Sequence, residues 1–203
     1  KPKFWDKNTP NFLSYLLLPI SFVYLILSKI KIHKKNKIKN IKTICVGNIY
    51  VGGTGKTTLC IKLNEILNSM GMTSCFVKKF YKDQIDEQRI LNDSGELYCA
   101  SSRVSAIKKI NTENFNAVIF DDGLQDQEIE YDLSIVCFNK KIGQGNGFLI
   151  PSGPLRENLS SLRKYDAVFF NGNNESETEF EYFIKKKFTH LKIFKSQYKI
   201  KNN

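Results

Sequence analysis

Histidine, arginine and paired cysteine are scarce in this chain, and each scarcity excludes a class of protein. Two histidines, His33 and His190, are too few for a histidine-based metal cluster. The five cysteines form no C-x-x-C pair and lie mostly in apolar runs, which fits buried thiols in a reducing compartment. Only four of the 31 basic residues are Arg, the residue that most often reads base edges in DNA. Zinc-binding, disulfide-rich secreted and base-reading proteins are therefore disfavoured.

The net charge of +11 is concentrated near the N-terminal end. Residues 1–42 contain ten Lys and one acidic residue, Asp6, so they carry +9, whereas residues 43–203 carry only +2. A nucleic-acid-binding domain needs a basic surface on its folded core, so we expect no nucleic-acid partner. The hydrophobic content of 41% and charged content of 25% are ordinary, and 203 residues suffice for one main core.

An uncharged stretch at residues 8–28 predicts contact with a membrane. Its apolar part, residues 12–27, is shorter than the roughly 20 residues needed to span a bilayer, and Pro19 interrupts it. No A-x-A cleavage site of a signal peptide follows. Seven lysines between residues 29 and 42 stand where anionic headgroups would lie. We expect an interfacial helix pair with a basic collar, and the alternative is a core helix followed by a solvated loop.

From residue 43 onward, short apolar runs alternate with segments of helical spacing. The expected strands are residues 43–46, 73–77, 96–100, 117–120, 133–138, 167–170 and 191–194. The expected helices are residues 57–70, 86–91, 104–110, 155–163 and 175–187. This alternation predicts an α/β fold, with a mostly parallel sheet and helices on both faces. The expected division is a membrane-associating segment at 1–42 and a core domain at 43–203.

A glycine-rich loop joins the first expected strand to the first expected helix and reads GNIYVGGTGKTT from residue 47 to residue 58. Its glycines allow a tight turn, so that backbone N–H groups and the helix start can surround phosphate oxygens. Tyr50 stands where the G-x-x-x-x-G-K-[ST] pattern has its first Gly. A glycine-rich turn without a ligand is the alternative, but the strand before and the helix after favour a P-loop NTPase-like site. The residues expected to bind the nucleotide are Gly52, Gly53, Thr54, Gly55, Lys56, Thr57 and Thr58.

Two adjacent carboxylates, Asp121 and Asp122, end the strand expected at residues 117–120. In open α/β sheets, ligands bind outside the carboxyl ends of the strands. An Asp at such a strand end in a phosphate-loop enzyme holds Mg²⁺ directly or through water. An Asp-Asp-Gly turn is also ordinary loop chemistry, but the presence of a phosphate loop favours metal binding.

Several motifs taken together resemble one family, the tetraacyldisaccharide 4'-kinases of Gram-negative lipid A assembly. The most discriminating shared run is NGFLIPSGPLRE at residues 146–157, which a generic ATPase has no reason to carry. The other shared segments are Lys3-Phe4-Trp5, Leu18-Pro19-Ile20-Ser21, residues 46–57, Asp86-Glu87 and residues 121–125.

The resemblance implies transfer of the γ-phosphate of ATP to the 4'-hydroxyl of a tetraacyl glucosamine disaccharide 1-phosphate, which gives lipid IVA. It implies ATP and Mg²⁺ as cofactors, a lipid substrate, peripheral attachment to the cytoplasmic face of the bacterial inner membrane, and no obligate protein partner. Asp86 would be the general base, and Arg156 and Glu157 would belong to the active-site wall beside the nucleotide. The remaining residues that it implies are Lys56 and Thr57 at the phosphates and Mg²⁺, and Asp121, Asp122 and Gln125 in the metal shell and reacting centre.

The chain departs from the family pattern at several positions. The run VKKFY at residues 77–81 replaces the family's SRGYG, and Ile85, Thr58 and Asp126 replace its Gly, Pro and His. The family's second, C-terminal lobe is expected to lie outside this chain, which would then be a fragment or a degenerate protein. The alternative function is a membrane-docked nucleotide switch or ATPase without a sugar acceptor, which the run at 147–157 disfavours.

Overall fold

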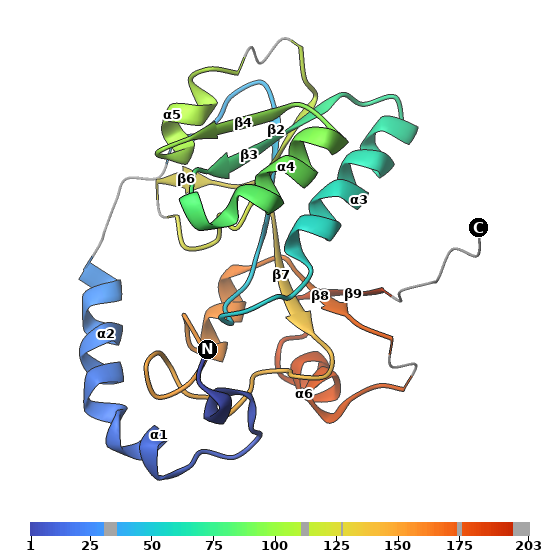
Figure 1. Ribbon diagram of the computed structural model, residues 1–203. Helices are drawn as coiled ribbons and strands as arrows, with labels where there is room; N and C mark the ends of the chain where they lie inside the picture. The colour runs from blue at the N-terminus through green and yellow to red at the C-terminus, as the bar shows by residue number, and fades with distance from the viewer. Residues whose placement is uncertain (31–35, 111–113, 127, 174–175, 197–203) are drawn as a thin grey trace. The chain divides into compact units, whose positions relative to one another are not determined.

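The computed structural model describes residues 1–30, 36–110, 114–126, 128–173 and 176–196 (Figure 1). The chain forms two compact units. The first unit comprises Lys1–Ile32, Asn48–Thr54 and Val136–Asn203, and the second comprises His33–Gly47 and Gly55–Ile135. The glycine-rich loop passes from the first unit to the second between Thr54 and Gly55, so its two halves belong to different units.

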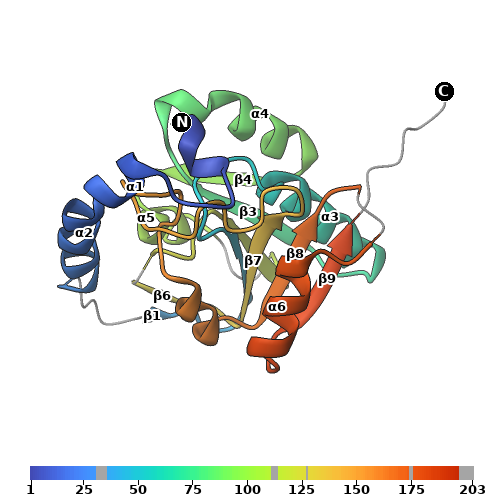
Figure 2. The ribbon, with the colours of Figure 1, turned by 90° about the horizontal axis from the view of Figure 1, so that it is seen from below.

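Parallel strands form the centre of the second unit, in the order β4-β3-β5-β2, of which Figure 2 labels β3 and β4. Their bounds are β2 Lys42–Gly47, β3 Ser74–Lys79, β4 Leu97–Ala100 and β5 Ala117–Asp121. Strands β3 and β5 are buried along almost their whole length, as expected where helices cover both faces of a parallel sheet. The register places Val46 and Lys78 on either side of Asp121. The carboxyl ends of β2, β3 and β5 therefore meet at Asp121.

The helices of the second unit lie on both faces of these strands (Figure 1). They are α3 Lys56–Ser69, η2 Lys82–Gln84, α4 Ile85–Ser94 and α5 Arg103–Ile107. Cys75 and Val77 of β3 pack with Ala106 of α5, whereas Lys78 reaches Glu87 of α4. Because successive side chains of a strand point to opposite faces, α5 covers one face and α4 lies on the other. Two short parallel strands, β1 Asn36–Lys37 and β6 Ile129–Glu130, form a separate ladder that the sequence did not predict.

The first unit contains the remaining strands and the N-terminal helices. Its elements are η1 Lys3–Asp6, α1 Phe12–Leu16, α2 Leu18–Ile30, η3 Leu159–Lys164, β8 Ala167–Asn171, α6 Glu179–Lys187 and β9 Lys192–Ser196, and β7 Leu133–Asn139 begins in the second unit and ends in the first. Strands β8 and β9 pair in parallel. Phe180 of α6 packs edge-on against Phe138 and Phe170, which fixes this helix to the strands.

The helices α1 and α2 are the pair that the sequence predicts around Pro19. Asn11 and Ser14 form a capping box at the start of α1. Pro19 lies in the first turn of α2, where a missing backbone N–H removes no intrahelical bond. Within the described residues, no helix combines the length and the apolar character needed to cross a bilayer.

The predicted fold class is confirmed, because seven strands form one mostly parallel sheet in the order β4-β3-β5-β2-β7-β8-β9. The helix predicted at residues 155–163 is wrong in its first half, since the helical turn begins only at Leu159. The N–H of Leu155 donates to the carbonyl of Phe148, and the N–H of Arg156 donates to that of Ile49. These long-range bonds hold the chain in an extended form that helix formation would have to break.

Candidate functional site

The second half of the glycine-rich loop forms the start of α3. Gly55, the residue before the helix, has a left-handed φ of 81°, which glycine adopts without steric cost. Lys56, Thr57 and the exposed Thr58 follow in the first turn. The backbone N–H groups of this turn have no partner within the helix and lie at the positive end of its dipole. The helix start therefore has the properties of an anion site.

Two lysine–aspartate pairs lie at the carboxyl end of β5. Lys56 Nζ is 3.8 Å from Asp122 Oδ1, and Lys78 Nζ is 2.5 Å from Asp121 Oδ2. Thr57 Oγ1 donates to the same oxygen of Asp121 at 3.4 Å. Asp121 is fully buried, and its other oxygen, Oδ1, has no hydrogen-bond partner among the described residues. The structure thus brings together four residues for which the sequence predicts phosphate or metal binding.

Lys78 belongs to this group, although the sequence analysis gives it no role. Its side chain is 1% exposed, and its Nζ also donates to Glu87 Oε2 at 2.7 Å. Burial acts to lower the pKa of Lys78, but the carboxylates of Asp121 and Glu87 outweigh burial, so the pKa is raised above its ordinary value. The signal in the sequence is a lysine near the end of a buried strand. Its partner can be identified only once the strand register is known.

Arg103, a second residue without a predicted role, fixes the backbone after β5. Its Nη2 donates to the carbonyl oxygen of Asp121 at 3.1 Å and also to the carbonyl oxygen of Asp122. Its Nη1 lies 3.5 Å from a carboxylate oxygen of Asp126. Asp122 has a left-handed φ of 56°, which is uncommon for a residue with a side chain. A Cβ at Gly123 would lie 2.9 Å or less from Tyr131 and Cys45. The turn is therefore held by the guanidinium and by close packing.

The predicted general base and the predicted metal-shell glutamine lie at the edge of this group. Asp86 is exposed in the first turn of α4. The neighbouring Glu87 joins α4 to the end of β3 through its bond to Lys78. Gln125 is exposed in the turn that follows Asp122. Among the described residues, Asp86 itself makes no hydrogen bond or ion pair to the carboxylates of β5.

The first half of the glycine-rich loop, Asn48–Thr54, is held inside the first unit. The N–H of Val51 donates to the carbonyl of Pro154 at 2.8 Å. Asn48 Nδ2 donates to the carbonyl of Gly52 and to Thr54 Oγ1, both at 3.2 Å. The bond to Pro154 joins the loop to the run at residues 146–157. The two bonds from Asn48 connect residues within the loop.

Tyr50 departs from the phosphate-loop pattern because its side chain fills space in the first unit. Its ring is 1% exposed and packs with Leu149 and Leu155. Its hydroxyl donates to Asp6 and accepts from Lys1. Burial and the carboxylate of Asp6 raise the pKa of Tyr50.

Arg156 and Glu157 are partly buried at the end of the run at residues 146–157. The hydroxyl of Tyr24 on α2 donates to the carbonyl of Arg156 at 3.1 Å. Tyr165 donates to the carboxylate of Glu157, with oxygen distances of 3.0 and 3.1 Å. The backbone at Arg156 is therefore anchored by a side chain of α2, and the carboxylate of Glu157 is anchored by Tyr165, eight residues further along the chain.

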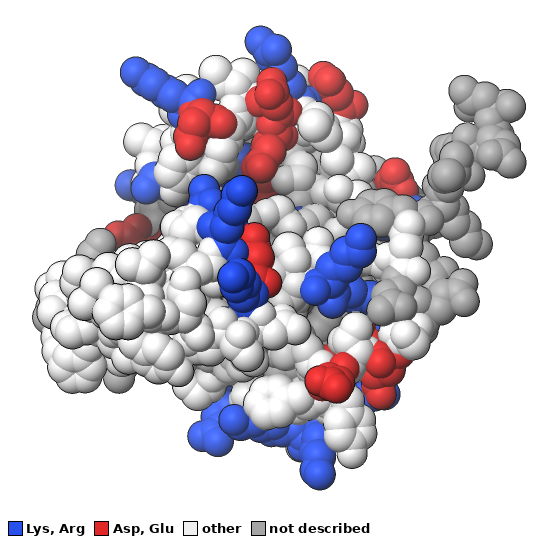
Figure 3. Space-filling view, turned by 60° about the horizontal axis from the view of Figure 1, so that its bottom comes forward, with Lys and Arg blue, Asp and Glu red and all other residues white. Residues whose placement is uncertain are grey.

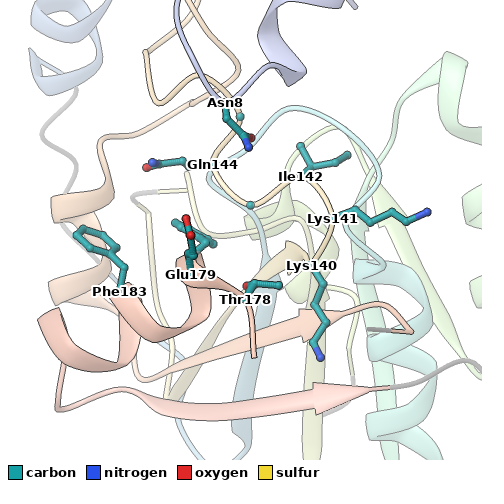
Figure 4. A pocket seen from close by; sticks show the side chains of 11 residues that line it. Asn8, Lys140, Lys141, Ile142, Gln144, Thr178, Glu179 and Phe183 are labelled. Atoms are coloured by element: carbon teal, nitrogen blue, oxygen red, sulfur yellow. The ribbon is translucent and has the colours of Figure 1, made fainter. Parts of the chain in front are cut away.

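A cavity of about 490 Å³ lies elsewhere in the first unit, between α6 and the loop at residues 140–145 (Figure 4). Lys140, Gln144, Thr178 and Phe183 are among the residues that line it. None of the residues predicted for the site lines this cavity. In the described ranges, no three His, Cys, Asp or Glu side chains converge in a way that could hold a metal ion.

Comparison with known proteins relates the chain to one family. A family model described as Tetraacyldisaccharide-1-P 4'-kinase matches residues 13–203. A tetraacyldisaccharide 4'-kinase from Pelagibacter ubique (strain HTCC1062) is 54% identical over 176 residues, which cover 87% of this chain and 56% of the relative. One from Rickettsia bellii (strain OSU 85-389) is 34% identical over 191 residues, covering 85% and 59%. The chain thus spans less than two thirds of the length of these relatives.

A solved structure resembles the fold. It is described as the "apo" form of LpxK from Aquifex aeolicus in complex with ATP, and it matches with a TM-score of 0.64 at 24% identity. The match covers 83% of this chain and 61% of that one. The match shows a likeness of fold.

Proposed function

This chain belongs to the tetraacyldisaccharide-1-P 4'-kinase family, and on that basis we propose that it forms the nucleotide-binding part of an ATP-dependent lipid kinase. The reaction transfers the γ-phosphate of ATP to the 4'-hydroxyl of an acylated glucosamine disaccharide 1-phosphate and gives lipid IVA. The observation that carries the proposal is the meeting of Lys56 and Thr57 with Asp121 and Asp122. Phosphoryl transfer needs groups that position the reactants and neutralise charge, which these residues supply.

Two features of the glycine-rich loop support phosphate binding by residues 52–58. The first turn of α3 offers free backbone N–H groups, and Lys56 adds a point charge. A Cβ added at Gly53 would meet no atom within 4 Å, so packing inside the protein does not require glycine there. A phosphate that approaches the backbone closely does require it.

The oxygen atoms at the end of β5 fit Mg²⁺. Asp121 Oδ1 is buried without a hydrogen bond from the described residues, and the hydroxyl of Thr57 contacts the same carboxylate. Hard oxygen donors of this kind are the ligands that Mg²⁺ prefers, together with water and phosphate oxygens. Thr57, Asp121 and Asp122 would hold the ion, with Gln125 in its outer shell. When bound, the ion neutralises charge on the phosphates.

Asp86, Arg156 and Glu157 would act on the substrate side of the reaction. An exposed carboxylate such as that of Asp86 can accept the proton of the sugar hydroxyl as phosphate is transferred. Arg156 would contact anionic groups, and Glu157, which Tyr165 holds in place, would form part of the wall. These three roles rest on family membership and on the matching motifs.

The lipid substrate would be reached from the cytoplasmic face of the inner membrane. The buried hydroxyl of Ser21 donates to the carbonyl of Leu149 at 3.0 Å, so one side of α2 is tied to the protein. Apolar residues are exposed on α1 and on the rest of α2, among them Phe12 of α1 at 78% and Phe22 of α2 at 63%. Figure 3 shows a wide uncharged surface on its left side. The lysines at residues 29–42 follow directly in the sequence. An apolar surface beside a basic segment favours peripheral attachment to an anionic bilayer.

The proposal is tested with the full-length gene product in detergent micelles, supplied with radiolabelled ATP, Mg²⁺ and the tetraacyl disaccharide 1-phosphate. Lys56→Ala and Asp86→Asn are each expected to reduce labelled lipid at least about 100-fold. Lys62→Ala, on the exposed side of the same helix as Lys56, is the control and should leave the rate unchanged. Hydrolysis of ATP without labelled lipid would refute the acceptor and favour a nucleotide-switch ATPase.

A further inference from the structure

We propose that the positive charge of Lys78 opposes a divalent cation at the carboxylates that end β5, so that the cation binds there only together with the nucleotide. The proposal rests on the proposed kinase function and adds a residue to its site. In the parallel register, Lys78 of β3 lies directly opposite Asp121 of β5. Its ammonium is 2.5 Å from Asp121 Oδ2 and belongs to a side chain that is 1% exposed.

Each of the two carboxylates at the end of β5 has a lysine beside it. Asp122 has Lys56 at 3.8 Å, and Asp121 has Lys78 at 2.5 Å, while the exposed Glu87 also contacts Lys78. Without the nucleotide, each lysine opposes a cation at its carboxylate, so the carboxylates attract a divalent cation only weakly. The triphosphate brings negative charge to Lys56 at the start of α3, and the balance then favours the cation.

The two lysines differ in what they can do. Lys56 lies in the first turn of the phosphate-binding helix, where its charge serves the nucleotide. Lys78 is enclosed between β5 and α4, where a second bond of 2.7 Å to Glu87 holds its Nζ. Glu87 is exposed, so solvent screens its charge, and it offsets the charge of Lys78 toward Asp121 only in part.

A purely structural ion pair does not account for the details of this contact. A buried ion pair adds little stability compared with well-packed apolar residues. In a structural pair both carboxylate oxygens are normally bonded, whereas Asp121 Oδ1 has no hydrogen bond from the described residues. Lys78 therefore neutralises one oxygen of Asp121 and leaves the other as an acceptor.

The test titrates Mn²⁺, as a spectroscopic substitute for Mg²⁺, into the full-length protein with and without a non-hydrolysable ATP analogue. Electron paramagnetic resonance reports the free Mn²⁺, so the measurement does not depend on lipid phosphorylation. The wild type should bind Mn²⁺ at this site only with the analogue. Lys78→Gln should bind it without the analogue at least about tenfold more tightly than the wild type, because the opposing charge is gone. Lys78→Arg, which keeps the charge, should behave as the wild type does.

Lys79→Gln makes the same substitution on the next residue of β3 and is the matched control. Thermal unfolding of each variant checks that the site is folded, and Lys78→Met provides a second neutral variant of different shape. Unchanged Mn²⁺ affinity without nucleotide in folded Lys78→Gln and Lys78→Met would overturn the proposal and make Lys78 a structural residue. A failure of lipid labelling with nucleotide-dependent Mn²⁺ binding intact would instead count against the kinase function alone.

Discussion

The guanidinium of Arg103 binds main-chain carbonyl groups, so it determines the shape of the turn that carries Asp122. One nitrogen, Nη2, serves the carbonyls of both Asp121 and Asp122, and the other, Nη1, contacts Asp126. A lysine ammonium has donors at a single point and cannot reproduce a planar fork. The left-handed backbone of Asp122 thus depends on the planar geometry of arginine as well as on its charge.

Arg103→Lys is therefore expected to destabilise the second unit although the charge is kept. The loss should be about 1.5–3 kcal/mol, because buried carbonyl groups lose charge-assisted hydrogen bonds. Urea unfolding followed by circular dichroism measures it. Arg89→Lys, on the exposed side of α4, is the control and should change the free energy of unfolding by less than about 0.5 kcal/mol. Equal stability of the two variants would show that the turn does not need the guanidinium.

Tyr50→Gly would restore the glycine of the phosphate-loop pattern, yet it is expected to destabilise the protein. The substitution removes a fully buried ring that packs with Leu149 and Leu155, and leaves a cavity that costs about 3–5 kcal/mol. Tyr50→Phe keeps the ring and loses only the hydroxyl bonds to Asp6 and Lys1, so about 1 kcal/mol is expected. Thermal unfolding ranks the variants. A Tyr50→Gly protein as stable as the wild type would refute the packing role.

At the scale of elements, the sequence could predict what depends on neighbours in the chain. The strand, glycine loop and helix around Lys56 follow a local pattern, and so does the apolar strand that ends at Asp121. The pairing of Lys78 with Asp121 depends on the register of two strands far apart in sequence. The failed helix at residues 155–163 has the same cause, because backbone bonds such as that from Arg156 to Ile49 override local spacing.

The carboxylate of Asp132 links the residue before β7 to β2 and should make stability depend on pH. Asp132 Oδ2 accepts from the backbone N–H and the hydroxyl of Thr43 at 2.9 and 3.0 Å. Burial acts to raise the pKa of Asp132, but the bonds from Thr43 and the nearby lysines lower it below its ordinary value of 3.8. A lowered folded-state pKa stabilises the protein above the unfolded pKa, and this contribution is lost as pH falls through the folded pKa.

Asp132→Asn is thus expected to lose on the order of 1 kcal/mol at pH 6, since the carboxylate is partly exposed and screened. The difference from the wild type should shrink as pH falls below 3.8 toward the lowered folded-state pKa, because Asp132 then becomes protonated. Urea unfolding between pH 3 and pH 7 measures it. Asp83→Asn, at an exposed position of η2, controls for removal of a charge. A difference that is constant with pH would contradict the assignment.

For the whole molecule, composition and motifs were sufficient to predict the fold class and the family, both of which are now established. The roles of Asp86, Arg156 and Glu157 stay predictions, as does the domain division at residue 42. Chain-local patterns place residues on a helix start or a strand end, but the proposed roles also depend on where the proposed substrate would lie. That position depends on contacts with the substrate and is not encoded in any single motif.

The outer face of α1 and α2 should determine binding to a bilayer. Phe22→Glu is expected to weaken binding to vesicles of phosphatidylethanolamine and phosphatidylglycerol by roughly 10- to 100-fold, because a buried phenyl ring contributes about 1.5–3 kcal/mol. Met70→Glu, at an equally exposed apolar residue after α3, is the matched control and should bind as the wild type does. Flotation measures the bound fraction. Vesicles of phosphatidylcholine alone should bind the protein more weakly, and so should the mixed vesicles in added salt. In both conditions the lysines at residues 29–42 contribute less to binding. Equal flotation of both variants would show that this face packs on protein instead.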